Sequence, residues 1–398
     1  MTLPARLPIP PAVTSIAQRL EASGYETWCV GGAVRDNLLG EPNHDFDLAT
    51  AAPPDVVRKL FRRTVPIGIE HGTVAVLDDE GTPHEVTTFR KDVRTDGRHA
   101  VVEFGVSLEE DLARRDFTIN TIAHHPLRGD WRDPFDGRRD LDAKLVRAVG
   151  RPEERFREDY LRIVRALRFA ARFGFTIDAA TWDAAVGAAD GLRHLSAERV
   201  RDEWFKGLAS ARRVSELVDL WRRVGALALW LPEIAVRGGE EVDRFEARNP
   251  VLLTAYLSSD PRATLARLRC SRTAIDRGTR IAAHRNEWPD PKDERAVRRW
   301  LAAVGPAAAD LLAVAVADAA AAGLADAVAR VRASGAPLTI GDLAVNGSDL
   351  LAAGVPAGPA LGQVLRALLE DVLDDPAANT RAALVSRIPR HVAGGTPR

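Results

Sequence analysis

The chain has 398 residues, enough for two or more domains, and its 46% hydrophobic and 28% charged residues are ordinary for a soluble globular protein. Its formal net charge of −1 excludes attraction of a nucleic acid by overall positive charge, so such a partner would have to meet local arginine patches. Two cysteines far apart in the sequence argue against a disulfide scaffold or a thiolate zinc site.

The N-terminal sequence MTLPARLPIPPAV lacks the apolar segment of a signal peptide. We also expect no uninterrupted apolar stretch long enough to span a bilayer. Together with the two cysteines, which fit a reducing compartment, these features predict a soluble protein of the cytoplasm with no membrane partner.

Hydrophobic periodicity predicts a helix over residues 12–24 and a second helix over residues 53–62, which begins at a proline pair. Between them, residues 28–50 predict a short apolar strand, a glycine turn, the start of a helix and a second strand. Two further strands are expected at residues 73–78 and 84–90.

The second strand of segment 28–50 is expected to carry Asp45 and Asp47. Side chains two residues apart on a strand point to the same face, so the two carboxylates would project together. Two like charges this close are unfavourable without a cation between them. An oxygen-only ligand set suits Mg²⁺, which completes its shell with water and substrate phosphates, so this strand predicts a magnesium site. The alternative is a solvated strand end.

Gly31 and Gly32 stand where the first strand gives way to the helix, and bare backbone N–H groups can approach a phosphate there. Arg35 follows, where its guanidinium would clamp the same polyphosphate. A glycine pair alone is usually a plain turn, but the combination with Arg35, Asp36 and the DFD run resembles the nucleotidyltransferases of the DNA polymerase β type. More narrowly, the segment is similar to the class II CCA-adding tRNA nucleotidyltransferases and the related bacterial poly(A) polymerases.

This resemblance implies an α+β fold, in which a polymerase-β-like head with a small mixed sheet is followed by an all-helical neck, body and tail. It implies a catalytic head at residues 1–150, a neck with a nucleobase-recognition motif at 151–215, and a tRNA-binding helical body and tail at 216–398. It also favours Glu85 as a third carboxylate beside the aspartate pair. The spacing alone leaves Glu85 equally an exposed strand charge.

Residues 91–105 are polar and charged around a DG turn at residues 96–97, so we expect a mobile segment. The class II enzymes that add all three nucleotides carry a flexible loop at this place. The resemblance therefore favours full CCA addition, or addition of the terminal A. A plain surface hairpin is the alternative that the residues themselves leave open.

Residues 114–120 read RRDFTIN and match a motif of the same family letter for letter. Its three charged residues, Arg114, Arg115 and Asp116, are expected to stand directly before an apolar helix, an unusual place for merely solvated side chains. The resemblance implies that Arg115 contacts the nucleotide and that Asp116 lies near its ribose. Arg114 is interpreted as structural.

A single helix is expected over residues 153–173, and three arginines spaced by three residues would form an oblique stripe on it: Arg162, Arg165 and Arg168. As a bare pattern, such a stripe is more often a salt-bridged solvent face than a binding site. However, the sequence EDYLR at residues 158–162 resembles the nucleobase-recognition motif of the family. The resemblance also implies that Arg165 and Arg168 contact the triphosphate or the tRNA end.

The chemistry of Asp159 and Arg162 suits base recognition. Cytosine and adenine each present an amino donor beside an unprotonated ring nitrogen, and a carboxylate only accepts whereas a guanidinium only donates. Asp159 can therefore accept from the amino group while Arg162 donates to the ring nitrogen. Uracil and guanine would leave both charged groups unpaired, and such a site can reject an analogue by about 10⁴-fold or more.

The sequence ERVRDE at residues 198–203 matches the last neck motif of the family. We interpret Glu198, Arg199 and Glu203 mainly as a structural network that holds the recognition helix in place. Further along, a glycine-rich turn at residues 354–362 would offer backbone N–H groups to an RNA phosphate or simply join two helices.

The resemblance implies an enzyme that adds C, C and A to the 3′ end of tRNA without a nucleic-acid template. CTP and ATP would be its substrates and Mg²⁺ its cofactor, held by Asp45 and Asp47 in a two-metal transfer that releases pyrophosphate. The tRNA acceptor end is the expected partner, and no protein partner is evident. The alternatives are a bacterial poly(A) polymerase, an A-adding enzyme beside a CC-adding partner, and an idle RNA-binding protein; the aspartate pair argues against the last.

Overall fold

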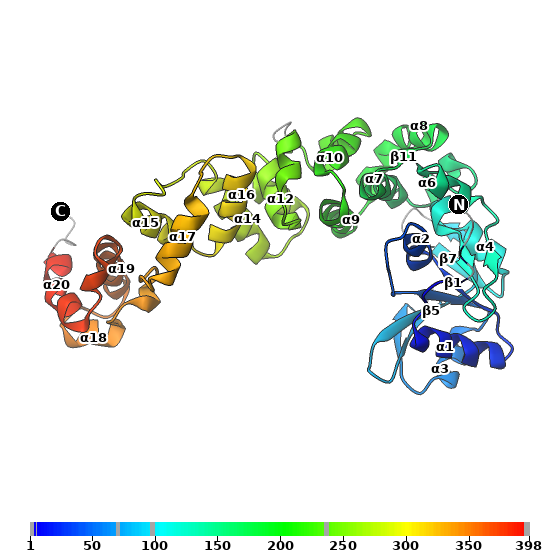
Figure 1. Ribbon diagram of the computed structural model, residues 1–398, viewed down its shortest axis with the longest axis horizontal. Helices are drawn as coiled ribbons and strands as arrows, with labels where there is room; N and C mark the ends of the chain where they lie inside the picture. Colours follow the sequence, from blue (N-terminus) through cyan, green and yellow to red (C-terminus); the bar gives the residue numbers. More distant parts are fainter. Residues whose placement is uncertain (1–3, 5, 69–71, 96–99, 235–238, 394–398) are drawn as a thin grey trace. The chain divides into compact units, whose positions relative to one another are not determined.

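The structure is a computed structural model that describes all residues except 1–3, 5, 69–71, 96–99, 235–238 and 394–398. It divides into two compact units, Met1–Pro232 and Glu233–Arg398 (Figure 1). The first unit combines a mixed sheet with helices, and the described elements of the second are helical. The predicted α+β fold class is therefore confirmed, whereas the finer boundaries near residues 150 and 215 stay predictions.

The main sheet of the first unit has seven strands in the order β3-β4-β5-β2-β1-β8-β9. Neighbouring strands are antiparallel except β2 and β5, which are parallel. The strands are β1 (Thr27–Val30), β2 (Asp47–Thr50), β3 (Thr64–Gly68), β4 (Thr73–Leu77), β5 (Pro83–Thr88), β8 (Ala123–His124) and β9 (Trp131–Arg132). Two smaller ladders pair β6 (Arg90–Thr95) with β7 (Ala100–Phe104), and β10 (Leu145–Val146) with β11 (Thr176–Ile177).

The helices of the first unit pack against this sheet and against one another. They are α1 (Pro11–Ala22), α2 (Gly32–Leu38), α3 (Pro54–Leu60), α4 (Leu108–Ala113), α5 (Gly137–Asp142), α6 (Pro152–Glu158), α7 (Leu161–Phe173), α8 (Ala179–Gly187), α9 (Ala197–Ser210), α10 (Val214–Arg223) and α11 (Ala226–Trp230). Short 3₁₀ turns are η2 (Thr118–Asn120) and η3 (Ala189–His194). The predicted helices near residues 12–24 and 53–62 and the predicted strands near 73–78 and 84–90 are confirmed as α1, α3, β4 and β5.

The alternation of side chains along β2 separates two hydrophobic cores and thereby positions the site. Leu48 belongs to the larger core, which includes residues of α1 and α3, and these two helices lie along the same side of the sheet (Figure 1). Ala49 belongs to a smaller core with residues of β1 and α4. Because side chains two apart share a face, Asp47 lies on the same face as Ala49, away from the larger core.

Three elements differ from the sequence prediction. The apolar helix expected directly after Asp116 is only the short 3₁₀ turn η2. The second strand of segment 28–50 begins at Asp47, so Asp45 precedes the strand instead of lying on it. The run expected as one helix over residues 153–173 is two helices, because Asp159 adopts extended backbone angles (φ −155°, ψ 105°). Its carboxylate accepts a hydrogen bond from the Leu161 N–H at 3.0 Å, and this local bond competes with helix continuation.

The segment expected to be mobile, residues 91–105, forms most of the antiparallel hairpin of β6 and β7. The structure therefore contains the hairpin that the residues left open as an alternative. The DG turn at its centre lies outside the described residues.

The second unit contains α12 (Pro250–Leu257), α13 (Pro261–Arg267), α14 (Arg272–His284), α15 (Glu294–Val304), α16 (Ala308–Ala317), α17 (Leu324–Ala333), α18 (Gly347–Ala352), α19 (Pro359–Asp374) and α20 (Arg381–Ala393), with short 3₁₀ turns between some of them. Contrary to the expectation from sequence, one described run, Glu294–Ala317, is long and apolar enough to cross a membrane by length and composition. However, 56% of its most apolar window is buried inside the protein, so core packing accounts for its apolar side chains.

Candidate active site

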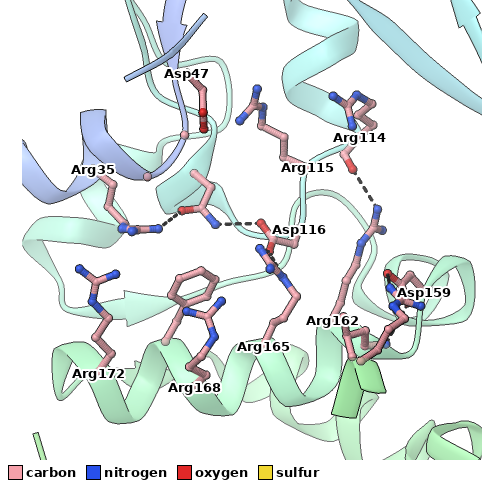
Figure 2. Close-up of a pocket in the computed structure, with 16 residues that line it drawn as sticks. Arg35, Asp47, Arg114, Arg115, Asp116, Asp159, Arg162, Arg165, Arg168 and Arg172 are labelled. Carbon is pink, nitrogen blue, oxygen red and sulfur yellow. Dashed lines mark hydrogen bonds and ion pairs between the residues drawn. The ribbon is translucent and has the colours of Figure 1, made fainter. Parts of the chain in front are cut away.

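A cavity of about 510 Å³ opens in the first unit between α2, the RRDFTIN segment, α7 and α9 (Figure 2). It contains eight arginines against three aspartates, a formal excess of five positive charges, which suits a polyanion such as a nucleoside triphosphate. Its lining is Gly31, Gly32, Arg35, Asp47, Arg114, Arg115, Asp116, Asn120, Asp159, Leu161, Arg162, Arg165, Arg168, Phe169, Arg172 and Arg199. Ten of the twelve predicted site residues are in this set, and Asp45 and Glu85 are not.

Three carboxylates gather at the edge of the cavity. β2 and β5 are parallel with Leu48 opposite Val86, so the preceding residues, Asp47 and Glu85, lie side by side on neighbouring strands. Burial, reinforced by the negative charges of Glu85 and Asp45, raises the pKa of Asp47 to about 6, although Arg115 opposes this shift. Asp47, the partly buried member of the three, therefore lies in the negative field of the other two carboxylates.

The carboxylate oxygens of this donor set suit a hard cation. Within the described parts of the chain, no group of three or more His, Cys, Asp or Glu side chains is arranged to hold a metal by itself. Asp47 and its two acidic neighbours nevertheless supply only oxygen donors, and their mutual repulsion raises the pKa of Asp47. A divalent cation that takes part of its shell from water and phosphate fits such a site.

The glycine turn leaves room beside this aspartate. Gly31 has a φ of +79°, which L side chains rarely adopt, and it ends β1 and caps α2. A Cβ at Gly31 would lie 3.2 Å from Arg115 Nη1 and 3.6 Å from Asp47 Oδ2. The absence of a side chain at Gly31 thus keeps open the space between the Arg115 guanidinium and the Asp47 carboxylate.

Arg35 is buried at the wall of the cavity (4% exposed) and points to the RRDFTIN segment. Its Nε donates to Asp36 Oδ1 at 2.8 Å and its Nη1 donates to Asn120 Oδ1 at 2.5 Å. Its guanidinium also lies over the rings of Phe169 and Phe173, each at 4.9 Å. Burial lowers the pKa of Arg35, but the Asp36 carboxylate opposes that shift.

Arg115 is less completely paired. Its Nη2 contacts Asp111 Oδ2 at 3.2 Å, and Asp111 also accepts from Arg114 Nε at 3.0 Å. The buried Nε of Arg115 has no hydrogen-bond partner among the residues that the structure describes. Buried donors without partners are uncommon, so Arg115 is suited to receive an acceptor from a ligand.

Asp116 links the RRDFTIN segment to α7. Its Oδ2 accepts from Arg165 Nε at 2.8 Å, and its Oδ1 accepts from Asn120 Nδ2 at 2.8 Å and from the Phe117 N–H at 2.9 Å. Burial alone would raise the pKa of Asp116, but Arg165 and the hydrogen bond from Asn120 hold this pKa well below its usual range. Asn120 thus connects Arg35 to Asp116 in the chain of hydrogen bonds shown in Figure 2.

The proposed base-reading residues have protein partners in this structure. Asp159 Oδ2 accepts from Arg199 Nη2 at 2.7 Å. Arg162 Nη1 donates to Glu158 Oε2 at 2.6 Å, and its Nη2 donates to the Arg114 carbonyl at 3.0 Å. Both side chains line the cavity, so a base that enters it would replace their present protein partners.

The α7 arginines form a continuous row beneath the cavity, and Figure 2 shows Arg165, Arg168 and Arg172 on the same helix. Arg168 is buried and its Nε donates to Glu203 Oε2 at 2.6 Å, which ties α7 to α9. Arg172 contacts Asp36 at 2.9 Å and Glu41 at 3.3 Å. These contacts agree with the structural network that we expected of Glu203.

Sequence reasoning missed six lining residues: Arg114, Asn120, Leu161, Phe169, Arg172 and Arg199. Arg172 lies four residues after Arg168 and extends the arginine stripe, and Asn120 is the last residue of RRDFTIN. The sequence near each of them could therefore have indicated its place in the site. Arg199 was interpreted as structural, but it also faces the cavity through its pair with Asp159.

Comparisons with known proteins agree along the chain. Residues 27–147 match the family profile described as poly A polymerase head domain. Residues 174–237 match the profile described as probable RNA and SrmB-binding site of polymerase A, and residues 307–388 match the putative domain 2 of tRNA nucleotidyltransferase.

Similar curated proteins and a solved structure cover nearly the whole chain. The CCA-adding enzyme of Lactiplantibacillus plantarum is 38% identical over 401 residues, which span 94% of each chain. The CCA-adding enzyme of Geobacillus kaustophilus is 37% identical over 380 residues, covering 92% of this chain and 93% of its own. The crystal structure of the Bacillus stearothermophilus CCA-adding enzyme in complex with CTP superposes with a TM-score of 0.82 at 32% identity, covering 96% of this chain and 97% of that one.

Proposed function

The chain belongs to the CCA-adding tRNA nucleotidyltransferases, and we propose that the arginine-lined cavity is the place where it performs that reaction. The enzyme adds C, C and A to the 3′ end of tRNA from CTP and ATP and releases pyrophosphate. The relatives named CCA-adding enzyme match from head to tail, which favours this reaction over poly(A) synthesis.

Asp47, with Asp45 and Glu85 beside it, would hold Mg²⁺, which supplies positive charge to the attacking 3′-hydroxyl oxygen and to the departing pyrophosphate. Burial and the neighbouring carboxylates raise the pKa of Asp47, and this supports the role, since a bound cation would offset both effects. The register of β2 against β5 explains why Glu85, 38 residues later in the chain, joins the aspartates.

The triphosphate would lie between the glycine turn and the arginines. Gly31 and Gly32 leave space for phosphate oxygens, and Arg115 offers its unpartnered Nε. Arg35 supports the wall through Asp36 and Asn120 and adds positive charge. Arg165 and Arg168 complete the positive row but are paired with Asp116 and Glu203, so we assign them to charge and shape more than to direct contact.

The base would be read by Asp159 and Arg162. Asp159 would accept from the exocyclic amino group of cytosine or adenine, and Arg162 would donate to the adjacent ring nitrogen. Arg199 and Glu158 hold these two side chains in the cavity wall, so a correct base replaces one set of charged hydrogen bonds with another. Uracil or guanine would break the pairs without replacing them, which is the physical basis of rejection.

The tRNA acceptor arm is the second substrate. We propose that the helical second unit measures the arm by shape and phosphate contacts, the usual way in which duplex RNA is recognised. We also place the reaction in the cytoplasm, in keeping with Cys29 and Cys270, which are both free thiols.

One observation carries the proposed site: a single cavity of about 510 Å³ gathers the Asp47 carboxylate, eight arginines and the Asp159 and Arg162 side chains of EDYLR. The direct test incubates the protein with tRNAs ending at the discriminator base, at C and at CC, with each of the four nucleoside triphosphates alone and together. We expect C on the first two ends and A on the third. Incorporation of A only onto CC ends would replace full addition with A addition, and long A tails on unrelated RNA would indicate a poly(A) polymerase.

Replacing the base-reading carboxylate tests the pocket more narrowly. Asp159→Ala should lower the preference for CTP over UTP by about 10²-fold or more, while the rate with CTP falls less, because rejection depends on leaving this group unpaired. The measurement is kcat/KM for each nucleotide on a tRNA ending at the discriminator base. Unchanged discrimination against UTP would contradict the role of Asp159.

A further inference from the structure

The break between α6 and α7 places Asp159 in the arginine-lined cavity. A contact on the side of the break that faces away from this cavity supports it. Asp159 and Leu161 line the arginine-lined cavity, whereas Tyr160 between them does not. Tyr160 instead lines a second cavity, of about 440 Å³, with residues of α6, α8 and η3. Neighbouring side chains at the break therefore line two different cavities.

The tyrosine ring is seated directly on Gly191 of η3. A Cβ added at Gly191 would lie 2.0 Å from Tyr160 Cε1 and 2.2 Å from Tyr160 Cδ1. Real Cβ atoms do not approach other atoms this closely, so only glycine allows the ring to occupy this position. The contact requires a glycine here although the backbone of Gly191 is not in the left-handed region.

The surface under the ring is itself firmly held. Leu192, the next residue, is fully buried, and its carbonyl accepts a hydrogen bond from Trp230 Nε1 at 3.0 Å. The Gly191 N–H donates to the Ala188 carbonyl at 2.9 Å. The first turn of η3 is thus closed internally, and η3 is tied to α11 through Trp230, so it can act as a fixed stop for the Tyr160 ring.

Apart from the side-chain pairs of Asp159 with Arg199 and of Arg162 with Glu158, the break is held by two local hydrogen bonds. The Arg162 N–H donates to the Asp159 carbonyl at 3.1 Å, and the Leu161 N–H donates to the Asp159 carboxylate. A shift of Tyr160 would therefore move Asp159 and the first turn of α7, including Arg162, as one piece. Misplacement of a positioned group by about 1 Å can cost about 10²-fold in function.

We propose that Tyr160 and Gly191 are positioning residues for nucleotide selection: the ring, wedged against η3, sets the place of Asp159 and Arg162 in the cavity. The inference rests on the proposed base-reading role of that pair and extends it to two residues that do not touch the nucleotide. The second cavity then has a function, because it accommodates the Tyr160 ring on the side of the break opposite the arginine-lined cavity.

The test compares kcat/KM for CTP and UTP in four variants of the full-length chain. Gly191→Ala and Tyr160→Ala should each lower the CTP-over-UTP preference by about 10- to 100-fold. Tyr160→Phe keeps the ring and should retain the preference. Gly187→Ala is the matched control, because Gly187 lines the same second cavity but a Cβ there meets nothing within 4 Å.

The double variant Tyr160→Ala/Gly191→Ala separates the wedge from a general loss of stability. Removal of the ring removes the three shortest contacts of the added Cβ, all with Tyr160, so the double variant should be no less selective than Tyr160→Ala alone, a clear departure from additivity. Thermal unfolding of each variant shows whether it is folded, and Tyr160→Ala, which adds no atoms, carries the test if Gly191→Ala does not fold.

Retained selectivity in both Gly191→Ala and Tyr160→Ala, or a fall in kcat without a change in the CTP-to-UTP ratio, would overturn the inference. Asp159→Ala is assayed in parallel to separate two kinds of failure. If Asp159→Ala is also fully selective, the base-reading role itself is wrong. If Asp159→Ala loses selectivity while the two wedge variants keep it, only the positioning role is wrong.

Discussion

At the scale of single residues, charged side chains in this cavity rarely stand alone. Asp116 holds Arg165, Glu203 holds Arg168, and Asp159 holds Arg199. Pairing keeps the guanidinium groups in place without a ligand, and it prevents the cost of burying isolated charges. Asp47 differs, because burial and the nearby carboxylates of Glu85 and Asp45 raise its pKa.

Asp47→Ala should therefore abolish transfer, by about 10³-fold or more, because the cation would lose its central oxygen ligand. Binding of tRNA should remain near that of the unchanged protein, since no arginine is removed. Nucleotide incorporation and a tRNA gel shift measure the two effects. Glu80→Ala, which removes an exposed carboxylate in the turn after β4, is the control; residual transfer by Asp47→Ala would mean that the metal site is misassigned.

At the scale of elements, the β1–α2 turn and the α7–α9 pair carry the site. Gly31 ends β1 with a positive φ and leaves space between Arg115 and Asp47. α7 supplies the arginine row, and α9 supplies Glu203 to hold it. Each element can be perturbed at one residue that has a matched control elsewhere in the first unit.

Gly31→Ala should raise the KM for nucleotide by about tenfold and cost about 1–2 kcal/mol of stability, because the methyl group enters the cavity and the positive φ becomes strained. Gly24→Ala is the control: Gly24 also has a positive φ, +85°, but a Cβ there meets nothing within 4 Å. Steady-state kinetics should separate the two variants, while urea denaturation should show similar losses. Equal kinetics in both would mean that the space beside Gly31 is not used.

Glu203→Ala should destabilise the first unit by about 3–5 kcal/mol, because it leaves Arg168 buried without its carboxylate partner. Asp202→Ala, one residue earlier, removes an exposed partner of Arg201 and should cost less than about 1 kcal/mol. Urea denaturation of both variants gives the comparison. Equal small losses would show that the buried pair between α7 and α9 contributes no more than a surface pair.

At the scale of the whole molecule, a buried histidine that does not line the cavity ties folding to pH. His124 on β8 is 1% exposed, and neither ring nitrogen has a hydrogen-bond partner among the described residues. Burial, with His125 and Arg6 nearby and Asp130 opposing, lowers the pKa of His124 to about 4. The folded state therefore favours the neutral ring.

The unfolded chain binds this proton near pH 6.5 and the folded chain only near pH 4, so stability should fall as pH drops through this window. The loss from His124 alone is up to about 3 kcal/mol. His124→Phe keeps a ring against Trp131 but cannot titrate, so it should reduce the fall in the free energy of unfolding between pH 7 and pH 4. Urea denaturation of both proteins at pH 7, 6, 5 and 4 measures it, and parallel curves would contradict the assignment.

Much of the site could be predicted because its chemistry is local in sequence. The glycine turn, RRDFTIN and EDYLR are contiguous segments, and each resembles a family motif that carries its role with it. The resemblance also favoured Glu85, although only the parallel register of β2 and β5 explains why it lies beside Asp47.

Other features depended on long-range contacts. The helix expected over residues 153–173 was broken at Asp159 by a side-chain hydrogen bond that helical periodicity does not reveal. The partner of Asp159 in the proposed base-reading pair follows from the packing of α7 against α9, and Arg199 was interpreted as structural because its pair with Asp159 spans 40 residues.

The amino-acid sequence by itself determined the fold class, the family and the chemical groups of the site, because hydrophobic period and short motifs need only neighbouring residues. The tertiary structure alone decided which charges meet, where the helix breaks and which residue lies behind the break. Those outcomes depend on close approach between segments distant in the chain, such as the ring of Tyr160 on Gly191, and no local pattern encodes a distance in space.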